Sequence, residues 1–230
     1  LDDGLLKDYD DSLKNFQKEH NLTIFHLMGQ HVNYKQRYRT KQARFWASSY
    51  EDKRPELTNA QRKMLSHYDN ATLYNDSIVA QIVKRFQKQD AIVIYVPDHG
   101  EECYEENRGF ICRNHSAEID WPLAHYEFEI PFWIYCSPKY IRNHRDIYRQ
   151  IRKAKDKRFM TDALPHLLLY LAGIETPTYK EEYNILSPKY DEMRPRILKN
   201  SADYDKLRDA HLEKIKKEES KKVKKKERRN

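Results

Sequence analysis

The segment Ala91-Ile92-Val93-Ile94-Tyr95-Val96-Pro97-Asp98-His99-Gly100-Glu101 decides the fold of this chain. Its first six residues are apolar and rich in β-branched side chains, which favours a strand that is covered on both faces. An Asp–His pair then follows at the end of the strand. Because ligands of open α/β sheets bind where loops leave the carboxyl ends of strands, the segment predicts a sheet with a site beside it.

Two further apolar runs, Leu22–Met28 and Ile130–Tyr135, predict strands of the same kind. The first of them ends in Gly29 and His31, so we expect a second part of the site there. Between the first two strands, apolar residues recur at helical spacing and predict a helix that packs on the sheet. These residues are Tyr74, Ile78, Val79, Ile82, Val83 and Phe86.

A second helix is predicted from about Asp162 to Ala172, with a leucine-rich core face. Thr161 or Asp162 can cap its start, Pro165 is tolerable in its first turn and Gly173 can close it. The order of elements predicts an α/β fold, with a mixed sheet flanked by helices. The polar and aromatic segment Arg39–Gln61 is interpreted as an insertion or lid.

The length of 230 residues suits one domain. With 34% charged residues the chain is polar, but its 17 Tyr are too many for a disordered protein, so we expect it to fold. The net charge is +7, of which +6 lies between His211 and Asn230. We therefore expect a nearly neutral globular part over residues 1–200 and a basic helical or disordered tail over 201–230. The tail is interpreted as solvated, with contact to anionic lipid headgroups or nucleic acid as the alternative. For the protein as a whole, no nucleic-acid partner is expected. No apolar run has the roughly 18 residues of a membrane span, so the chain as written is expected to be soluble.

A carboxylate and an imidazole at Asp98 and His99 can both bind one Zn²⁺, and Gly100 lets the backbone turn so that they face one point. Glu101 is close enough to be a further ligand, an orienting acceptor or a proton shuttle. The structural alternative is that Asp98 caps a turn and His99 is a partly buried histidine with a local hydrogen bond. Two ligands alone do not complete a zinc site, which requires three or four.

Three histidines on loops could bind phosphoryl oxygens: His31, and either His115 or His125, between which spacing does not decide. His26 is interpreted as structural. Hydroxyl nucleophiles are unconvincing, because there is no Gly-x-Ser-x-Gly elbow and the Ser and Thr candidates suit loops, helices or caps. They are Ser48, Ser49, Thr72 and Thr161. The three cysteines have no CxxC spacing, and a disulfide between Cys103 and Cys112 remains open.

Taken in order, these residues resemble the lipid A phosphoethanolamine transferases of the alkaline phosphatase and sulfatase superfamily. The resemblance spans about residues 1–190. It runs through Asp3-Gly4-Leu5-Leu6, Phe25-His26-Leu27-Met28-Gly29-Gln30-His31, Tyr34 to Tyr38, Tyr68-Asp69-Asn70-Ala71, Pro97-Asp98-His99-Gly100-Glu101, His115, Ile130-Pro131-Phe132 and Leu164 to Thr176.

The resemblance implies that Asp98 and His99 are zinc ligands, that His31 and His115 contact the transferred phosphoryl group and that Glu101 lines the site. His125 lies where the family varies and is interpreted as structural. The family's other zinc ligands, a Glu and the Thr nucleophile, lie upstream of anything that matches Leu1, as do its transmembrane helices. We therefore expect the chain to be the C-terminal half of a catalytic domain, without turnover of its own.

By resemblance, the full-length protein transfers phosphoethanolamine from phosphatidylethanolamine to lipid A or another cell-envelope sugar phosphate. It would be anchored in the bacterial inner membrane, with its catalytic domain in the periplasm. The alternative within enzymes is a sulfatase or phosphodiesterase of the same superfamily. An alternative of another class is a binding protein for anionic polymers that has no turnover.

Overall fold

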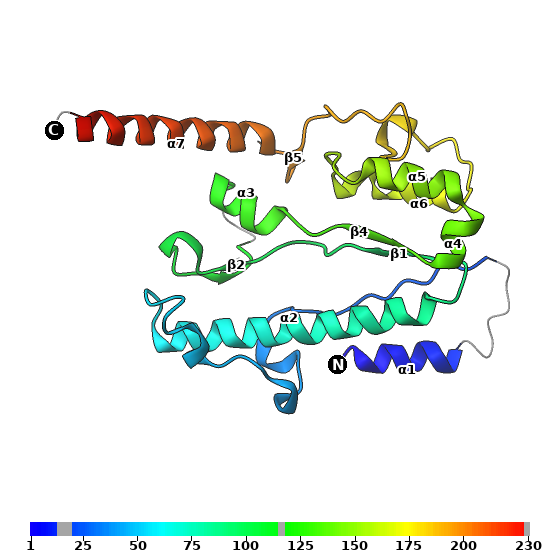
Figure 1. Ribbon diagram of the computed structural model, residues 1–230, viewed down its shortest axis with the longest axis horizontal. Coiled ribbons are helices and arrows are strands. Elements are labelled where there is room, and N and C mark those ends of the chain that lie inside the picture. The colour runs from blue at the N-terminus through cyan, green and yellow to red at the C-terminus, as the bar shows by residue number, and fades with distance from the viewer. Residues whose placement is uncertain (13–19, 115–117, 228–230) are drawn as a thin grey trace. The chain divides into compact units, whose positions relative to one another are not determined.

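The computed structural model describes residues 1–12, 20–114 and 118–227, of which 223–227 are described by their backbone alone. The chain divides into two compact units (Figure 1). Unit 1 comprises Leu1–Val93 and Glu102–Cys112, and unit 2 comprises Ile94–Glu101 and Arg113–Asn230. Helices and short strands alternate along the chain, which confirms the predicted mixed α/β fold.

Unit 1 is built on the long helix α2 (Asn59–Phe86), against which the N-terminal helix α1 (Asp3–Ser12) packs. The start of α2 is fixed by a capping box: Gln61 donates its backbone N–H to the Thr58 hydroxyl at 3.2 Å, and its side chain accepts from the Thr58 N–H at 2.8 Å. The buried face of α2 includes Tyr74 and Ile78. The predicted apolar stripe is therefore confirmed, and the helix begins well before it.

The segment predicted as an insertion or lid packs against α2. Tyr50 is buried in a cluster with Leu57 and Leu65, and its hydroxyl donates to Asp69. The Asn70 side chain accepts from the backbone N–H of Phe45 at 3.1 Å and donates to the Phe45 carbonyl at 2.8 Å. Three 3-10 helices order this part of the chain: η2 (Tyr34–Gln36), η3 (Thr40–Gln42) and η4 (Ala47–Tyr50).

The strand predicted at Leu22–Met28 is wrong. Phe25 and Leu27 pack beside the core of α1 and α2, whereas Leu22 is 77% and Ile24 79% exposed. The side chains thus alternate as in a strand, but no neighbouring strand in the described residues pairs with this backbone. Without a ladder of inter-strand hydrogen bonds, the segment is extended chain and not a strand.

The other two predicted strands are present, although the second begins later than expected. β1 (Ile92–Tyr95) pairs with β4 (Trp133–Cys136), and the Tyr95 ring stacks on Trp133 with centroids 5.3 Å apart. Two small antiparallel ladders complete the strands of the described chain. They are β2 (Glu102–Cys103) with β3 (Ile111–Cys112), and β5 (Ile197–Leu198) with β6 (Ala202–Asp203). Cys103, Cys112 and Cys136 are all free thiols.

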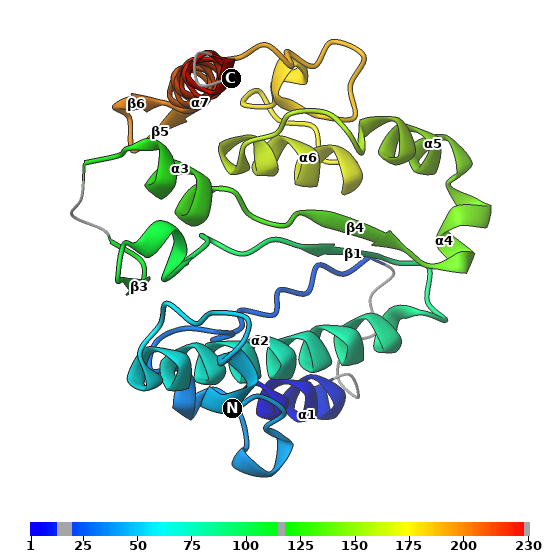
Figure 2. The same ribbon diagram turned by 60° about the vertical axis from the view of Figure 1, so that its left-hand side comes forward.

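In unit 2, α6 confirms the second predicted helix. After the 3-10 turn η6 (Thr161–Ala163) it runs over Leu164–Leu171, with Pro165 in its first turn and Gly173 beyond its end at φ +65°. The predicted cap residues do not cap it, since the Asp162 carboxylate binds Arg194 at 2.5 and 2.7 Å instead. Helix α5 (Arg145–Ala154) and the fully buried Leu167 belong to the same core cluster. α4 (Pro138–Asn143) precedes α5 (Figure 2).

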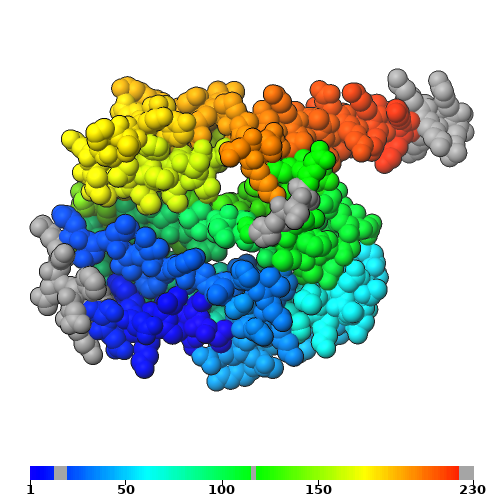
Figure 3. All heavy atoms as spheres, turned by 180° about the vertical axis from the view of Figure 1, so that it is seen from behind, coloured from blue at the N-terminus to red at the C-terminus, as the bar shows by residue number. Residues whose placement is uncertain are grey.

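The basic tail forms helix α7 (Tyr204–Glu227), whose first turn is anchored in unit 2. The Tyr204 hydroxyl donates to Glu129, and the Trp121 ring of α3 (Trp121–Phe128) stacks on His211 at 5.5 Å. The later turns stand clear of the other elements of this unit (Figure 3). The domain boundary at residue 200 stays a prediction. No helix in the described ranges is both long and apolar enough to cross a bilayer.

Candidate metal and phosphate site

The predicted Asp98-His99 pair lies on the loop that follows β1. The Nδ1 atom of His99 is 2.6 Å from the Gly100 carbonyl oxygen, to which it can donate as N–H. That bond fixes the tautomer in which Nε2 carries a lone pair. Nε2 is 3.7 Å from a carboxylate oxygen of Asp98, whose side chain is 87% exposed against 18% for His99. A nitrogen and an oxygen ligand atom therefore lie close together at the surface of unit 2.

This donor pair fits part of a zinc site. Imidazole nitrogen and carboxylate oxygen are ordinary zinc ligands, and a carbonyl oxygen that accepts a hydrogen bond from Nδ1 is a common way to orient a zinc-binding histidine. Within the described ranges, no group of three or more His, Cys, Asp and Glu side chains is arranged to hold a metal. Glu101 is on the same loop and half-buried. The loop thus offers two ligands, and the remaining ligands have to come from elsewhere.

The loop is held in place by the last turn of α3. The Gly100 N–H donates to the Glu127 carbonyl at 2.9 Å, and a Cβ atom at Gly100 would lie 2.3 Å from the Tyr126 carbonyl oxygen. Only glycine allows the two backbones to approach so closely. The Glu127 side chain is 2% exposed and accepts from the Asn114 N–H at 2.6 Å. Glu127 therefore holds the Asp98-His99 loop through its backbone carbonyl and the Asn114 backbone through its side chain, a role that the sequence analysis missed.

A cavity of about 1140 Å³ in unit 2 is lined by Asp98 and His99 at one side and by residues of β4 and α5 elsewhere. Seven Lys or Arg side chains line it, against three carboxylates. The cationic residues include Arg113, Arg152 and Arg158. A cleft with this excess of positive charge attracts anionic ligands.

Part of that charge is organised by Asp205 at the start of α7. Its carboxylate accepts from Arg196 at 2.6 and 3.1 Å and also binds Arg158. The hydrogen bonds from Arg196 hold the pKa of Asp205 below its ordinary value, although partial burial opposes the shift. The two guanidinium groups that line the cavity are thereby kept in fixed positions.

His31 belongs to unit 1, on the exposed turn after the extended segment. Its Nδ1 is 2.5 Å from the Val32 carbonyl oxygen. The turn is held by the Asp2 carboxylate, which accepts from the Gly29 N–H at 2.9 Å and the Met28 N–H at 3.2 Å. Gly29 has φ +54°, a conformation that favours glycine. Asp2 was not a predicted residue, because nothing in its local sequence distinguishes it from other surface acids.

Of the two remaining histidines, His115 lies outside the described residues. His125 is on α3, stacked on Trp121 at 5.5 Å, with Nδ1 2.9 Å from a Glu129 carboxylate oxygen. Through these contacts, His125 packs against neighbouring side chains at α3. Among the hydroxyls, Thr72 donates to the Tyr68 carbonyl and Ser49 accepts from the Trp46 N–H, as expected for local helix and turn contacts.

The sulfatase family model matches residues 1–174. The chain belongs to the sulfatase family. It is 31% identical over 194 residues to phosphoethanolamine transferase EptC of Escherichia coli O18:K1:H7, a match that covers 83% of this chain and 32% of that protein. A Kdo(2)-lipid A phosphoethanolamine 7''-transferase of Escherichia coli K12 is 32% identical over 162 residues, which cover 69% of this chain and 27% of the relative.

Among solved structures, this sulfatase-family chain is similar to the C-terminal periplasmic domain of Escherichia coli EptC in complex with Zn. The TM-score is 0.72 at 29% identity, over 90% of this chain and 57% of that one. The corresponding domain from Campylobacter jejuni shares the fold, with a TM-score of 0.63. The chain spans about a third of the length of the curated relatives. The resemblance identified from the sequence is thus confirmed at the level of family and fold.

Proposed function

We propose that the complete gene product is a zinc-dependent phosphoethanolamine transferase and that this chain supplies the C-terminal part of its catalytic domain. The Asp98-His99 loop carries the proposal, because it presents an oriented imidazole nitrogen beside an exposed carboxylate. Relatives named as phosphoethanolamine transferases and a Zn complex of a similar domain support it.

In this proposal, Asp98 and His99 are zinc ligands and Glu101 lines the site. Bound zinc lowers the pKa of a hydroxyl nucleophile and polarises phosphoryl oxygens. His31 and His115 donate hydrogen bonds to the phosphoryl group as its negative charge increases. Gly100 and Glu127 hold the metal-binding loop on α3 and do not touch the substrate.

The proposed donor is phosphatidylethanolamine and the proposed acceptor a phosphate of lipid A or a related cell-envelope sugar. The cationic lining of the cavity beside Asp98 and His99 supports an acceptor with negative charge. Such substrates place the catalytic domain on the periplasmic side of the bacterial inner membrane.

The test is to incubate the complete gene product with phosphatidylethanolamine and zinc and to measure protein and peptide masses. We expect a covalent phosphoethanolamine adduct on a hydroxyl side chain, reduced at least ~100-fold in Asp98→Ala and His99→Ala because the nucleophile is no longer activated. His26→Ala, at an exposed histidine to which no catalytic or metal-binding role is assigned, should retain the adduct.

Two results would contradict the proposal. One is a zinc-loaded protein that forms no adduct but hydrolyses sulfate esters, which would make it a sulfatase. The other is an adduct that survives replacement of both Asp98 and His99, which would remove the metal from the reaction.

A further inference from the structure

The net charge of the whole chain hides a strong local excess. Residues 138–158 hold nine Lys or Arg and two Asp, a formal charge of +7 that equals that of the entire sequence. The tail from His211 onward adds +6, so the rest of the chain is acidic by the same amount. Positive charge is thus concentrated in two segments, of which the first lies within the folded part of unit 2.

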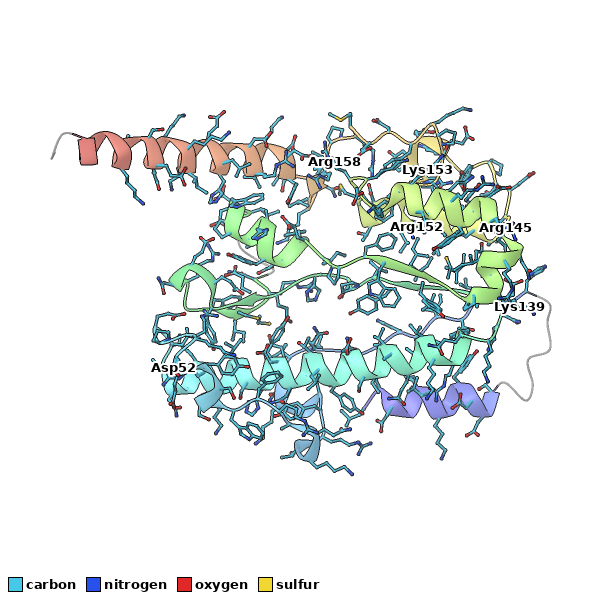
Figure 4. All side chains as sticks on the ribbon, viewed as in Figure 1. Asp52, Lys139, Arg145, Arg152, Lys153 and Arg158 are labelled. Atoms are coloured by element: carbon cyan, nitrogen blue, oxygen red, sulfur yellow. The ribbon has the colours of Figure 1, made fainter. Side chains whose placement is uncertain are left out.

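Most of the first segment is helix α5, and its charges lie on one side. Arg145, Arg149 and Arg152 recur at spacings of four and three, with Lys153 beside them, and all four are exposed. We call these four residues the α5 basic face. On the opposite side of the helix, Ile147 and Ile151 pack in the core with Leu167. Figure 4 shows Arg145, Arg152 and Lys153 along this helix.

Acidic neighbours neutralise little of the α5 basic face. The two aspartates of the segment are Asp146, which binds Arg149, and Asp156, which lies 3.6 Å from Lys155. In the described structure no ion pair involves Arg145, Arg152 or Lys153. Three exposed cations therefore remain available to an external anion.

One residue of the α5 basic face also lines the cavity of the candidate site. Arg152, and Lys155 just beyond the helix, line the cavity to which Asp98 and His99 contribute. An anionic surface against α5 would therefore contact a residue that also lines the cavity of the candidate metal ligands.

We propose that the α5 basic face docks unit 2 on an anionic phospholipid bilayer, by contacts of its cations with headgroup phosphates. The proposal rests on the proposed function, in which the donor is a membrane lipid. Contact stays at the headgroups, because the apolar side of α5 is already buried in the core. The aromatic residue of α5, Tyr148, is half-buried beside the face, so the helix has no fully exposed ring on which a nucleic-acid base could stack, which favours lipid over a single-stranded nucleic acid.

The test is co-sedimentation of the 230-residue chain with vesicles of phosphatidylcholine that contain a minority of phosphatidylglycerol. We expect binding that weakens with salt and is absent on pure phosphatidylcholine. The variant Arg145→Gln/Arg152→Gln/Lys153→Gln should partition roughly 100-fold more weakly at low salt, since each cation near the surface contributes about a factor of five. All three positions are exposed, so the fold should be retained.

Two control variants remove the same charge elsewhere. Lys41→Gln/Lys53→Gln/Lys88→Gln changes exposed lysines of unit 1, and Lys214→Gln/Lys216→Gln/Lys221→Gln changes exposed lysines of α7. We expect both to bind within a few-fold of the unmodified chain. Equal losses in all three variants would show a response to net charge alone and overturn the proposal.

A loss confined to the α7 variant would assign the contact to the tail and equally overturn it. The proposal would also be overturned if the chain bound a duplex oligonucleotide more tightly than the vesicles and the α5 variant lost that binding. The vesicles contain no phosphatidylethanolamine and the assay measures binding alone. A negative result in the vesicle assay would therefore not bear on formation of the zinc-dependent adduct. A negative result in the adduct assay would likewise not bear on vesicle binding.

Discussion

Gly100 is the residue whose replacement tests the geometry of the Asp98-His99 loop most specifically. In Gly100→Ala, the new Cβ would lie 2.3 Å from the Tyr126 carbonyl oxygen, so the loop must move away from α3. We expect the free energy of unfolding to fall by about 1–3 kcal/mol, as for other overpacked sites. Urea titration followed by tryptophan fluorescence measures it.

The matched control is Gly4→Ala, where a Cβ meets no atom within 4 Å on helix α1. Alanine is the better helix former, so this variant should be neutral or slightly more stable. If Gly100→Ala proved as stable as Gly4→Ala, the close approach of the loop to α3 would be wrong.

Asp205 gives a prediction that depends on pH. Its pKa in the folded chain is below the ordinary value of 3.8, so its ion pairs stabilise the fold above that pH and are lost as the pH falls through the folded pKa. Asp205→Asn should lower the free energy of unfolding at neutral pH by about 1–3 kcal/mol, since Arg158 and Arg196 lose a charged partner.

The measurement is the melting temperature of both proteins from pH 7 down to acid. The difference should be constant at neutral pH and should shrink below about pH 4. Asp156→Asn, at an aspartate that is 85% exposed, is the control and should have little effect. A difference between Asp205→Asn and the unmodified chain that persisted unchanged in acid would contradict the electrostatic explanation.

At the scale of elements, the start of α2 depends on its capping box. Thr58→Ala removes the acceptor of the Gln61 N–H and should lower the free energy of unfolding by about 1 kcal/mol. Thr58→Ser retains the hydroxyl and should recover most of that loss. Denaturant titration distinguishes them, and equal stability of the three proteins would show that this cap does not contribute.

The sequence predicted those elements whose signal is local. The strand at β1 and the helix at α6 follow from short apolar patterns and from Pro165 and Gly173. Leu22–Met28 carries the same apolar pattern as β1, but a strand also requires a partner, and pairing is not encoded in a single segment. The first half of α2 was not predicted as a helix, because its buried side includes polar residues such as Asn70. The Asn70 side chain donates a hydrogen bond to the Phe45 carbonyl oxygen.

The residues of the candidate site also differ in whether a local sequence signal predicts them. Asp98 and His99 could be found because two ligand types are adjacent in sequence, after a strand. Asp2 and Glu127 could not, since the Asp2 carboxylate holds the turn before His31 and the Glu127 carboxylate holds Asn114, each from another part of the chain and by hydrogen bonds to backbone N–H groups. Their carboxylates resemble those of any surface acid until the fold brings the loops to them.

At the scale of the whole molecule, net charge is a poor guide to surface chemistry. Subtracting the tail leaves about +1, which suggested a nearly neutral globular part. That average combines the +7 of residues 138–158 with an acidic remainder. Electrostatic attraction at a surface depends on the local charge within about 10 Å at ordinary salt. The α5 basic face can therefore bind anions although the globular part is close to neutral overall.

The most direct test of the central claim, that Asp98 and His99 bind zinc, is the zinc affinity of the complete gene product measured by competition with a chromophoric chelator. We expect Asp98→Asn and His99→Gln each to weaken binding at least ~100-fold, because each removes one of about four ligands while keeping similar volume. The same change at His26, His26→Gln, should leave the affinity unaltered. Unchanged zinc affinity in both Asp98→Asn and His99→Gln would contradict the account.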